Sequence, residues 1–221
     1  MTRVLVLRPE PGASATVDKA RERGLDAIAV PLFTVEPLAW QAPEPIGFDG
    51  LLLTSGNAVR HGGEGLQALR RLKVYAVGEA TAEAARVAGF NVAATGDAGV
   101  DCLLSSIDPD LKLLHLCGAD RATPSDARQA ITPVAIYRST PLPAPDLSSA
   151  HGSVALVHSP RAGARLAELV HDRGSIAVAA ISAAAAAAVG GRWRVVETAE
   201  RPSDEALLAL AASLCNKPDP E

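Results

Sequence analysis

The sequence contains an internal repeat, and this repeat constrains the possible folds more than any other feature. The first copy covers residues 51–104, and the second begins at Ala155, displaced by 104 positions. At this displacement the aligned pairs include Thr54 with His158, Ser55 with Ser159, Ala58 with Ala162, Val74 with Val178 and Leu103 with Leu207. The alignment needs no gap, which indicates a duplicated supersecondary unit. Two copies are too few for a solenoid, so we predict two similar α/β lobes with a cleft between them.

Short apolar runs alternate with helix-like segments along the chain. Runs of this kind are typical of parallel strands buried on both faces, and the aromatic content of only 3% fits a core of aliphatic side chains. The predicted strands are 4–7, 27–30, 50–53, 74–77, 91–94, 111–116, 133–137, 154–157, 177–181 and 194–197. Helices are expected at about 14–24, 58–71, 80–88, 100–107 and 203–214.

Two proline-rich stretches interrupt this alternation. The first contains Pro31, Pro37, Pro43 and Pro45, and the second is 139–145. Because dense prolines favour linkers or edge strands, we expect the chain to leave one lobe at the first stretch and to return at the second. The predicted division is 1–36 with 146–221 for lobe 1, 44–136 for lobe 2, and 37–43 with 137–145 for the linker. Each lobe would then contain five strands.

Composition and charge limit the classes of partner. A formal net charge of -4 argues against attraction to nucleic acid or to an anionic membrane. The N-terminus shows no signal-peptide pattern, the apolar run 183–189 is too short to span a bilayer, and the three cysteines form no CxxC pair. We therefore predict a cytoplasmic protein. A monomer is expected because no apolar helix face is left over.

Neither a metal site nor a cofactor is predicted. The five histidines show no HxxxH or HExxH spacing, and the chain contains no GxGxxG and no P-loop. No carboxylate pair and no Ser-His-Asp order stands out for acid–base or acyl chemistry.

Candidate ligand contacts lie where the predicted strands end. In open parallel sheets, ligands bind at the carboxyl ends of the strands, and free amides at helix starts suit anionic groups. These ends carry Arg8, Thr54, Ser55, Asn57, Gly78, Thr81, Gly118, Arg121, Ser159, Arg161 and Ser182. Each also has a structural alternative, as a helix cap, a tight turn or a solvated arginine. Spacing alone therefore predicts a two-lobed cleft for an anionic ligand, and no reaction.

Several ordered motifs resemble the uroporphyrinogen-III synthase family. They are DGLLLTSGNAVR, KVYAVGEATAEAARVAGF, LLHLCGADR, VAIYRST, VHSPRAGA and ERPSDEALLALAASL. The similarity covers nearly the whole chain and keeps the motif order. It implies an α/β fold of two flavodoxin-like lobes with parallel sheets, joined by a two-stranded linker, with the active-site cleft between them.

The resemblance also implies a reaction. Such an enzyme is a lyase that cyclises the linear tetrapyrrole hydroxymethylbilane, which is supplied by hydroxymethylbilane synthase. The substrate loses its hydroxyl as water, ring D attacks through its substituted carbon to give a spiro intermediate, and reclosure inverts ring D. No cofactor is needed. Positioning of the substrate would be the main contribution to catalysis, and proton transfer the second.

Individual residues can be carried over from the family motifs. Tyr137 matches the tyrosine before the return linker and is the candidate general acid. The residues that would hold substrate carboxylates are Thr54, Ser55 and Asn57 in the TSxxA loop, Gly78 and Thr81 in the GxxT loop, and Ser159 in the SP loop. One loop departs from the family, because 182–185 reads Ser-Ala-Ala-Ala where many members have Gly-Pro-Thr-Thr, and Ala185 cannot supply a threonine contact.

Two other interpretations follow from the same residues. The chain could be a non-catalytic, two-lobed binding or sensor module for a small polyanionic ligand. It could also be a family-like protein that has lost activity, as the alanine at position 185 suggests. Turnover separates the synthase from both alternatives, whereas binding alone does not.

Overall fold

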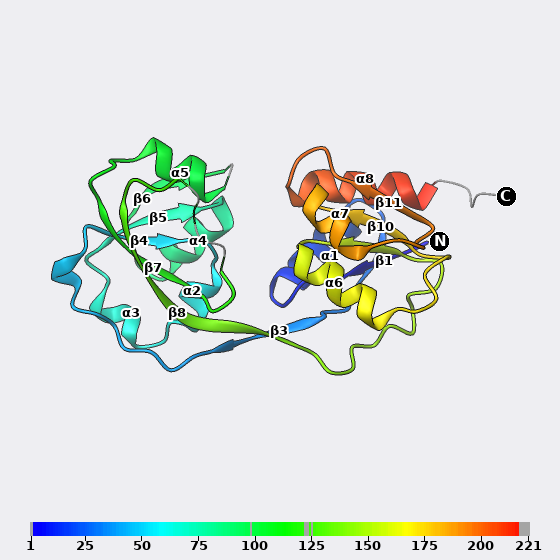
Figure 1. Ribbon diagram of the computed structural model, residues 1–221, viewed down its shortest axis with the longest axis horizontal. Helices are drawn as coiled ribbons and strands as arrows, with labels where there is room; N and C mark the ends of the chain where they lie inside the picture. The colour runs from blue at the N-terminus through cyan, green and yellow to red at the C-terminus, as the bar shows by residue number, and fades with distance from the viewer. Residues whose placement is uncertain (1, 98, 122–123, 125, 217–221) are drawn as a thin grey trace. The chain divides into compact units, whose positions relative to one another are not determined.

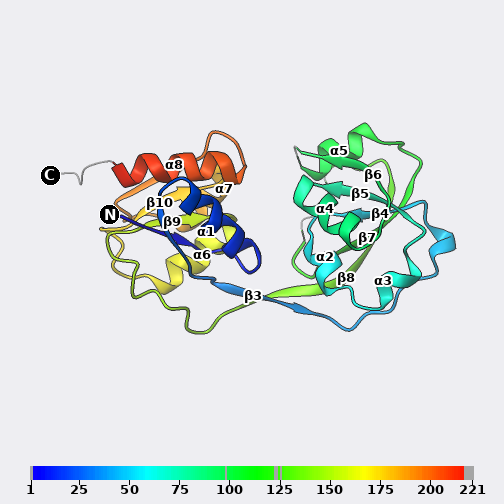
Figure 2. The same cartoon turned by 180° about the vertical axis from the view of Figure 1, so that it is seen from behind.

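The computed structural model describes residues 2–97, 99–121, 124 and 126–216. The chain divides into two compact units, Met1–Thr34 with Pro141–Glu221 (unit 1) and Val35–Thr140 (unit 2). Each unit contains a parallel-dominated sheet with helices on both of its faces (Figures 1 and 2). The predicted α/β class with two parallel-dominated sheets is therefore confirmed.

Unit 1 contains a five-stranded, fully parallel sheet. Its strands, in spatial order, are β11 (Val195–Thr198), β10 (Ala177–Ala180), β9 (Val154–Val157), β1 (Arg3–Val6) and β2 (Asp26–Ala29). Numbered by their appearance in the unit, they follow the flavodoxin order 2-1-3-4-5 in reverse. Helices α1 (Gly12–Glu22) and α8 (Asp204–Asn216) pack on one face, and α6 (Pro160–Leu169) and α7 (Ala183–Val189) pack on the other.

Unit 2 is built on a six-stranded sheet. The spatial order is β3 (Phe33–Pro37), β8 (Ala130–Pro141), β7 (Lys112–Gly118), β4 (Gly50–Leu53), β5 (Lys73–Val77) and β6 (Val92–Gly96). Helices α2 (Asn57–His61), α3 (Gly65–Ala68) and α4 (Glu79–Val87) cover one face, and α5 (Val100–Ser106) covers the other. A single 3-10 turn, η1 (Pro45–Gly47), precedes β4.

The internal repeat of the sequence is also a repeat of structure. β4 and β9 are displaced by 104 residues, as are the first residues of α4 and α7 and those of α5 and α8. The repeat strands have the same spatial order in both sheets, β6-β5-β4 and β11-β10-β9, and the next neighbour is β7 in one and β1 in the other. The two sheets therefore have the same spatial arrangement of strands. They differ in chain order, because β1 precedes the repeat strands in unit 1 whereas β7 follows them in unit 2.

The structure differs from the sequence prediction in several places, one of which is that α6 and α7 were not among the expected helices. The helix expected at 58–71 is split into α2 and α3, because Gly63 has φ +56, a left-handed conformation that ends a helix. Unit 2 has six strands rather than five, because β3 pairs along the edge of β8. The paired segment is β3, Phe33–Pro37, which lies mostly before the linker expected at 37–43. Just beyond the end of β3, the backbone amide of Leu38 donates a hydrogen bond to the carbonyl of Ile136.

Candidate functional site

Each sheet has a topological switch point, where the direction in which successive strands are added to the sheet reverses. In unit 2 the switch lies between β4 and β7, and in unit 1 it lies between β9 and β1. Ligands bind at such points, outside the carboxyl ends of the strands. The residues placed there are Thr54 and Gly118 in unit 2, and Arg8 and His158 in unit 1.

At the unit 2 switch, Thr54 is paired with a buried histidine. The Oγ1 atom of Thr54 lies 3.1 Å from Nε2 of His115, which belongs to β7 and is only 2% exposed. Burial, helped by the positive charge of Arg121, lowers the pKa of His115 to about 4. The imidazole is therefore neutral at pH 7 and carries one ring proton.

Tyr137 lies beside this pair, on β8. A register shift between Cys117 and Gly118 sets Tyr137 opposite Gly118, and a Cβ at Gly118 would lie 2.8 Å from Cε2 of the tyrosine ring. Glycine at position 118 thus allows the ring to lie against the β7 backbone. Burial raises the pKa of the Tyr137 hydroxyl, although hydrogen bonds with the Ser55 side chain and the Gly118 backbone oppose that rise.

A second histidine faces Tyr137 from the end of α2. The ring centroids of His61 and Tyr137 are 6.1 Å apart, with an interplanar angle of 38°. Burial, and secondly the charge of Arg60, lower the pKa of His61. The structure therefore brings together the predicted residues Thr54, Ser55, Gly118 and Tyr137, and adds His61 and His115.

The remaining predicted residues of unit 2 make local contacts. The Oδ1 atom of Asn57 accepts a hydrogen bond of 3.0 Å from Arg60, and the backbone N–H of Asn57 donates to Ser55 Oγ at 3.2 Å. Thr81 is buried in the first turn of α4. Arg121 is exposed three residues after β7 ends, and its side chain hydrogen-bonds Cys117.

Gly78 precedes α4 in a conformation that other residues rarely adopt, with φ +80 and ψ 142. No atom lies within 4 Å of a Cβ built at this position, so a side chain would add backbone strain alone. We expect Gly78→Ala to lower the free energy of unfolding by roughly 1–2 kcal/mol, measured by urea titration. The control is Gly174→Ala, which has equal space and no positive φ. Equal stability of the two variants would contradict the prediction.

At the unit 1 switch, Asp204 connects four elements. Its carboxylate accepts hydrogen bonds from Arg8 Nη1 at 3.2 Å and from Thr16 Oγ1 at 3.0 Å, and His158 Nε2 lies 3.1 Å away. Burial alone would raise the pKa of Asp204, but the hydrogen bond with His158, the charge of Arg8 and the bond from Thr16 lower it to about 2. Arg8, predicted to contact a ligand, is thus already paired within the protein.

The predicted serines of unit 1 are helix caps. Ser159 Oγ accepts from the amide of Ala162 at 3.1 Å, and Ser182 Oγ accepts from that of Ala185 at 3.3 Å. Ala185 is fully buried where α7 meets α6, and a Cβ at Gly163 would lie 2.9 Å from its carbonyl oxygen. Position 185, where alanine stands in place of the threonine expected from the family motif, is therefore part of a close helix contact in this chain.

Arg161, the last predicted residue of unit 1, packs on an aromatic ring. Its Cζ atom lies 4.7 Å from the centroid of Phe33, a cation–π distance. The residues Asp204, His158, His115 and His61 were not among the predicted site residues. For His115 a signal was present, because an imidazole interrupts the otherwise apolar side chains in the buried part of its strand.

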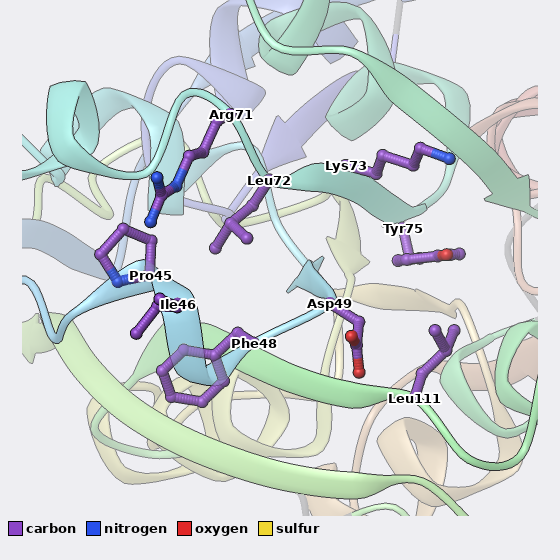
Figure 3. A pocket seen from close by; sticks show the side chains of 9 residues that line it. All are labelled: Pro45, Ile46, Phe48, Asp49, Arg71, Leu72, Lys73, Tyr75 and Leu111. Atoms are coloured by element: carbon purple, nitrogen blue, oxygen red, sulfur yellow. The ribbon is translucent and has the colours of Figure 1, made fainter.

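A pocket of about 520 Å³ in unit 2 lies away from this site. Its lining, which Figure 3 shows, comprises Pro45, Ile46, Phe48, Asp49, Arg71, Leu72, Lys73, Tyr75 and Leu111. Asp49, Lys73 and Leu111 stand at the amino ends of β4, β5 and β7, the edge opposite Thr54. The pocket is therefore not where ligands of parallel sheets bind.

The described residues contain neither a candidate metal site nor a candidate membrane-spanning helix. No group of three or more His, Cys, Asp or Glu side chains in this part of the chain could hold a metal ion. None of the helices in the described ranges is long and apolar enough to cross a membrane.

Comparison with known proteins gives one consistent family. The family model of uroporphyrinogen-III synthase HemD matches residues 14–209. Among solved structures, a uroporphyrinogen-III synthetase from Helicobacter pylori is 18% identical with a TM-score of 0.65, covering 97% of this chain and 100% of that chain. A mutant uroporphyrinogen III synthase from the extreme thermophile Thermus thermophilus is 20% identical with a TM-score of 0.54, covering 98% and 100%. No curated protein sequence matches.

Proposed function

The chain belongs to the uroporphyrinogen-III synthase family of tetrapyrrole biosynthesis, and from that premise we propose that it cyclises hydroxymethylbilane to uroporphyrinogen III. The reaction is a dehydration with inversion of ring D through a spiro intermediate, and it needs no cofactor. The family match over residues 14–209 carries the proposal. Hydroxymethylbilane synthase would supply the substrate directly, because hydroxymethylbilane otherwise closes spontaneously without inversion.

Tyr137 is the proposed general acid. Because its pKa is raised, the phenol keeps its proton at neutral pH and can donate it to the departing hydroxyl of the substrate. Water leaves, and the resulting phenolate keeps its hydrogen bonds with Ser55 and Gly118. Ring D loses a proton when the final ring closure restores its aromaticity, and that proton returns to Tyr137. The net change is loss of one water.

The substrate is a polycarboxylate, and the polar groups around Tyr137 suit it. Thr54 and Ser55 are half-buried hydroxyls at the carboxyl edge of the unit 2 sheet, and Arg121 adds positive charge beside them. Holding the bilane in a folded conformation favours inverted closure over spontaneous closure. In unit 1, Ser159 Oγ and Ser182 Oγ each accept a hydrogen bond within a helix cap, and a hydroxyl that accepts can still donate its own proton.

The experiment that tests this function is a coupled assay. Hydroxymethylbilane is generated in situ, and the oxidised porphyrin isomers are separated by chromatography with and without the protein. We expect predominantly type III product with the protein present. If type I product forms at the rate seen without protein, the chain is not a synthase, and a binding module or an inactive relative is the better interpretation.

A further inference from the structure

Thr54 and His115 form a hydrogen-bonded pair at the proposed site. The Thr54 hydroxyl is half-buried, and the His115 imidazole is buried. Thr54 directly follows β4, and His115 lies opposite Leu52 in the parallel pairing of β4 with β7. The Oγ1–Nε2 distance of 3.1 Å is that of a hydrogen bond. His115 itself is only 2% exposed, and its neighbours along β7, Leu114 and Leu116, are fully buried.

The fold does not require a histidine at this position. The equivalent pair of strands in unit 1 is β9 with β1, where Leu156, the repeat counterpart of Leu52, lies opposite Val6. Val6 is fully buried, so an apolar side chain fills the corresponding place in the other sheet. Burying an imidazole costs free energy unless its nitrogens are bonded. The hydrogen bond to Thr54 is thus the feature that distinguishes His115 from the apolar alternative.

The direction of this hydrogen bond decides what Thr54 can offer to a ligand. A neutral imidazole has one N–H and one acceptor nitrogen, and the partner of each nitrogen fixes the tautomer. If Nε2 accepts from Thr54, the hydroxyl proton is engaged in that hydrogen bond, and Oγ1 can only accept from a ligand. If Nε2–H donates to Oγ1, the hydroxyl proton is free to bond a carboxylate.

We propose that His115 is a positioning residue whose Nε2–H donates to Thr54 Oγ1, so that the Thr54 hydroxyl points its proton at a carboxylate of the substrate. This inference rests on the proposed function, because a polycarboxylate substrate is what makes a donor necessary at Thr54. The buried environment, which keeps the imidazole neutral, also prevents His115 from acting as a second fixed charge.

Steady-state kinetics of four variants test the coupling. We expect Thr54→Val to raise KM by about tenfold or more and His115→Leu to raise it about three- to tenfold, each with kcat changed less than about twofold. Adding His115→Leu to Thr54→Val should change KM by less than about 1.5-fold, since the hydroxyl is already gone. His115→Gln, which places an amide N–H where Nε2 stood, should restore KM to within about twofold of the parent value. Additive effects in the double variant would overturn the inference.

Nitrogen NMR of the imidazole provides a readout independent of activity. Long-range 1H–15N spectra of the intact protein at pH 7, with His115→Leu used to assign the signals, identify the nitrogen that carries the proton. The Nε2–H tautomer is expected, and the Nδ1–H tautomer would overturn the inference even if KM rises. Thermal unfolding of every variant shows whether a change in KM comes from loss of the fold. If His115→Leu unfolds, His115→Gln assigns the imidazole signals, and the tautomer of the parent protein still decides the inference.

The two proposals fail in distinguishable ways. If the parent protein gives no type III product, the proposed function is wrong, and the inference falls with it because no carboxylate substrate is left to require the donor. If the parent makes type III product while His115→Leu leaves KM unchanged, the function stands and the role of His115 is wrong.

Discussion

Replacing Tyr137 by phenylalanine is expected to lower kcat about 100-fold or more while KM changes less than about threefold. The ring would still pack against Gly118 and face His61, so only the hydroxyl and its proton are removed. A loss confined to kcat is the result expected for a group that acts in the transition state. The measurement is the initial rate of type III product over a range of hydroxymethylbilane concentrations.

Tyr75→Phe is the matched control for this variant. Tyr75 also has a pKa raised by burial, but it lies on β5 and lines the pocket at the opposite edge of the sheet. Its hydroxyl should therefore be dispensable, with kcat unchanged. If Tyr137→Phe keeps the parent kcat, another group supplies the proton, and Tyr137 is only a packed aromatic.

Asp204→Asn is expected to cost unit 1 about 2 kcal/mol of unfolding free energy near neutral pH, since the pKa of Asp204 is lowered from 3.8 to about 2. The asparagine leaves Arg8 and His158 without their anionic partner. The His158 side chain is only 8% exposed, so water cannot easily replace the lost bond. Denaturant titration followed by circular dichroism measures the loss.

The same substitution has a defined pH dependence. A depressed carboxyl pKa stabilises the folded state fully above the unfolded value of 3.8, and this contribution is lost as the pH falls through about 2. The stability difference between the parent and Asp204→Asn should therefore be constant well above the unfolded pKa and should disappear as the pH falls toward the folded one. Asp26→Asn is the control, because it breaks only the exposed pair with Arg3 and should cost less than about 1 kcal/mol. A pH-independent difference for Asp204→Asn would contradict this account.

Much of the fold could be predicted because its signals are local. Continuous apolar runs such as Leu51–Leu53 within β4 indicated buried parallel strands, and the repeat indicated that the pattern occurs twice. The break between α2 and α3 was missed, since Gly62 and Gly63 lie inside a segment that otherwise reads as one helix. The sequence did not show that β3 would pair with β8 and become a sixth strand of the unit 2 sheet. Edge pairing depends on a partner strand that is distant in the sequence.

The candidate site was predictable only in outline. The rule that ligands meet parallel sheets at the carboxyl ends of strands selected Thr54, Ser55, Gly118 and, through the family resemblance, Tyr137, and the structure places these four together. The same rule gave Arg8 as a free cation. It could not show that Asp204 accepts a hydrogen bond from it.

The sequence by itself determined the class of fold, the duplication and the family, because periodicity and ordered motifs are carried by neighbouring residues. Only the tertiary structure decided which polar side chains meet: Thr54 with His115 across 61 positions, His158 with Asp204 across 46, and Arg8 with Asp204 across 196. Hydrogen bonds require donor and acceptor within about 3 Å, and strand register and helix placement set such distances for residues far apart in the chain.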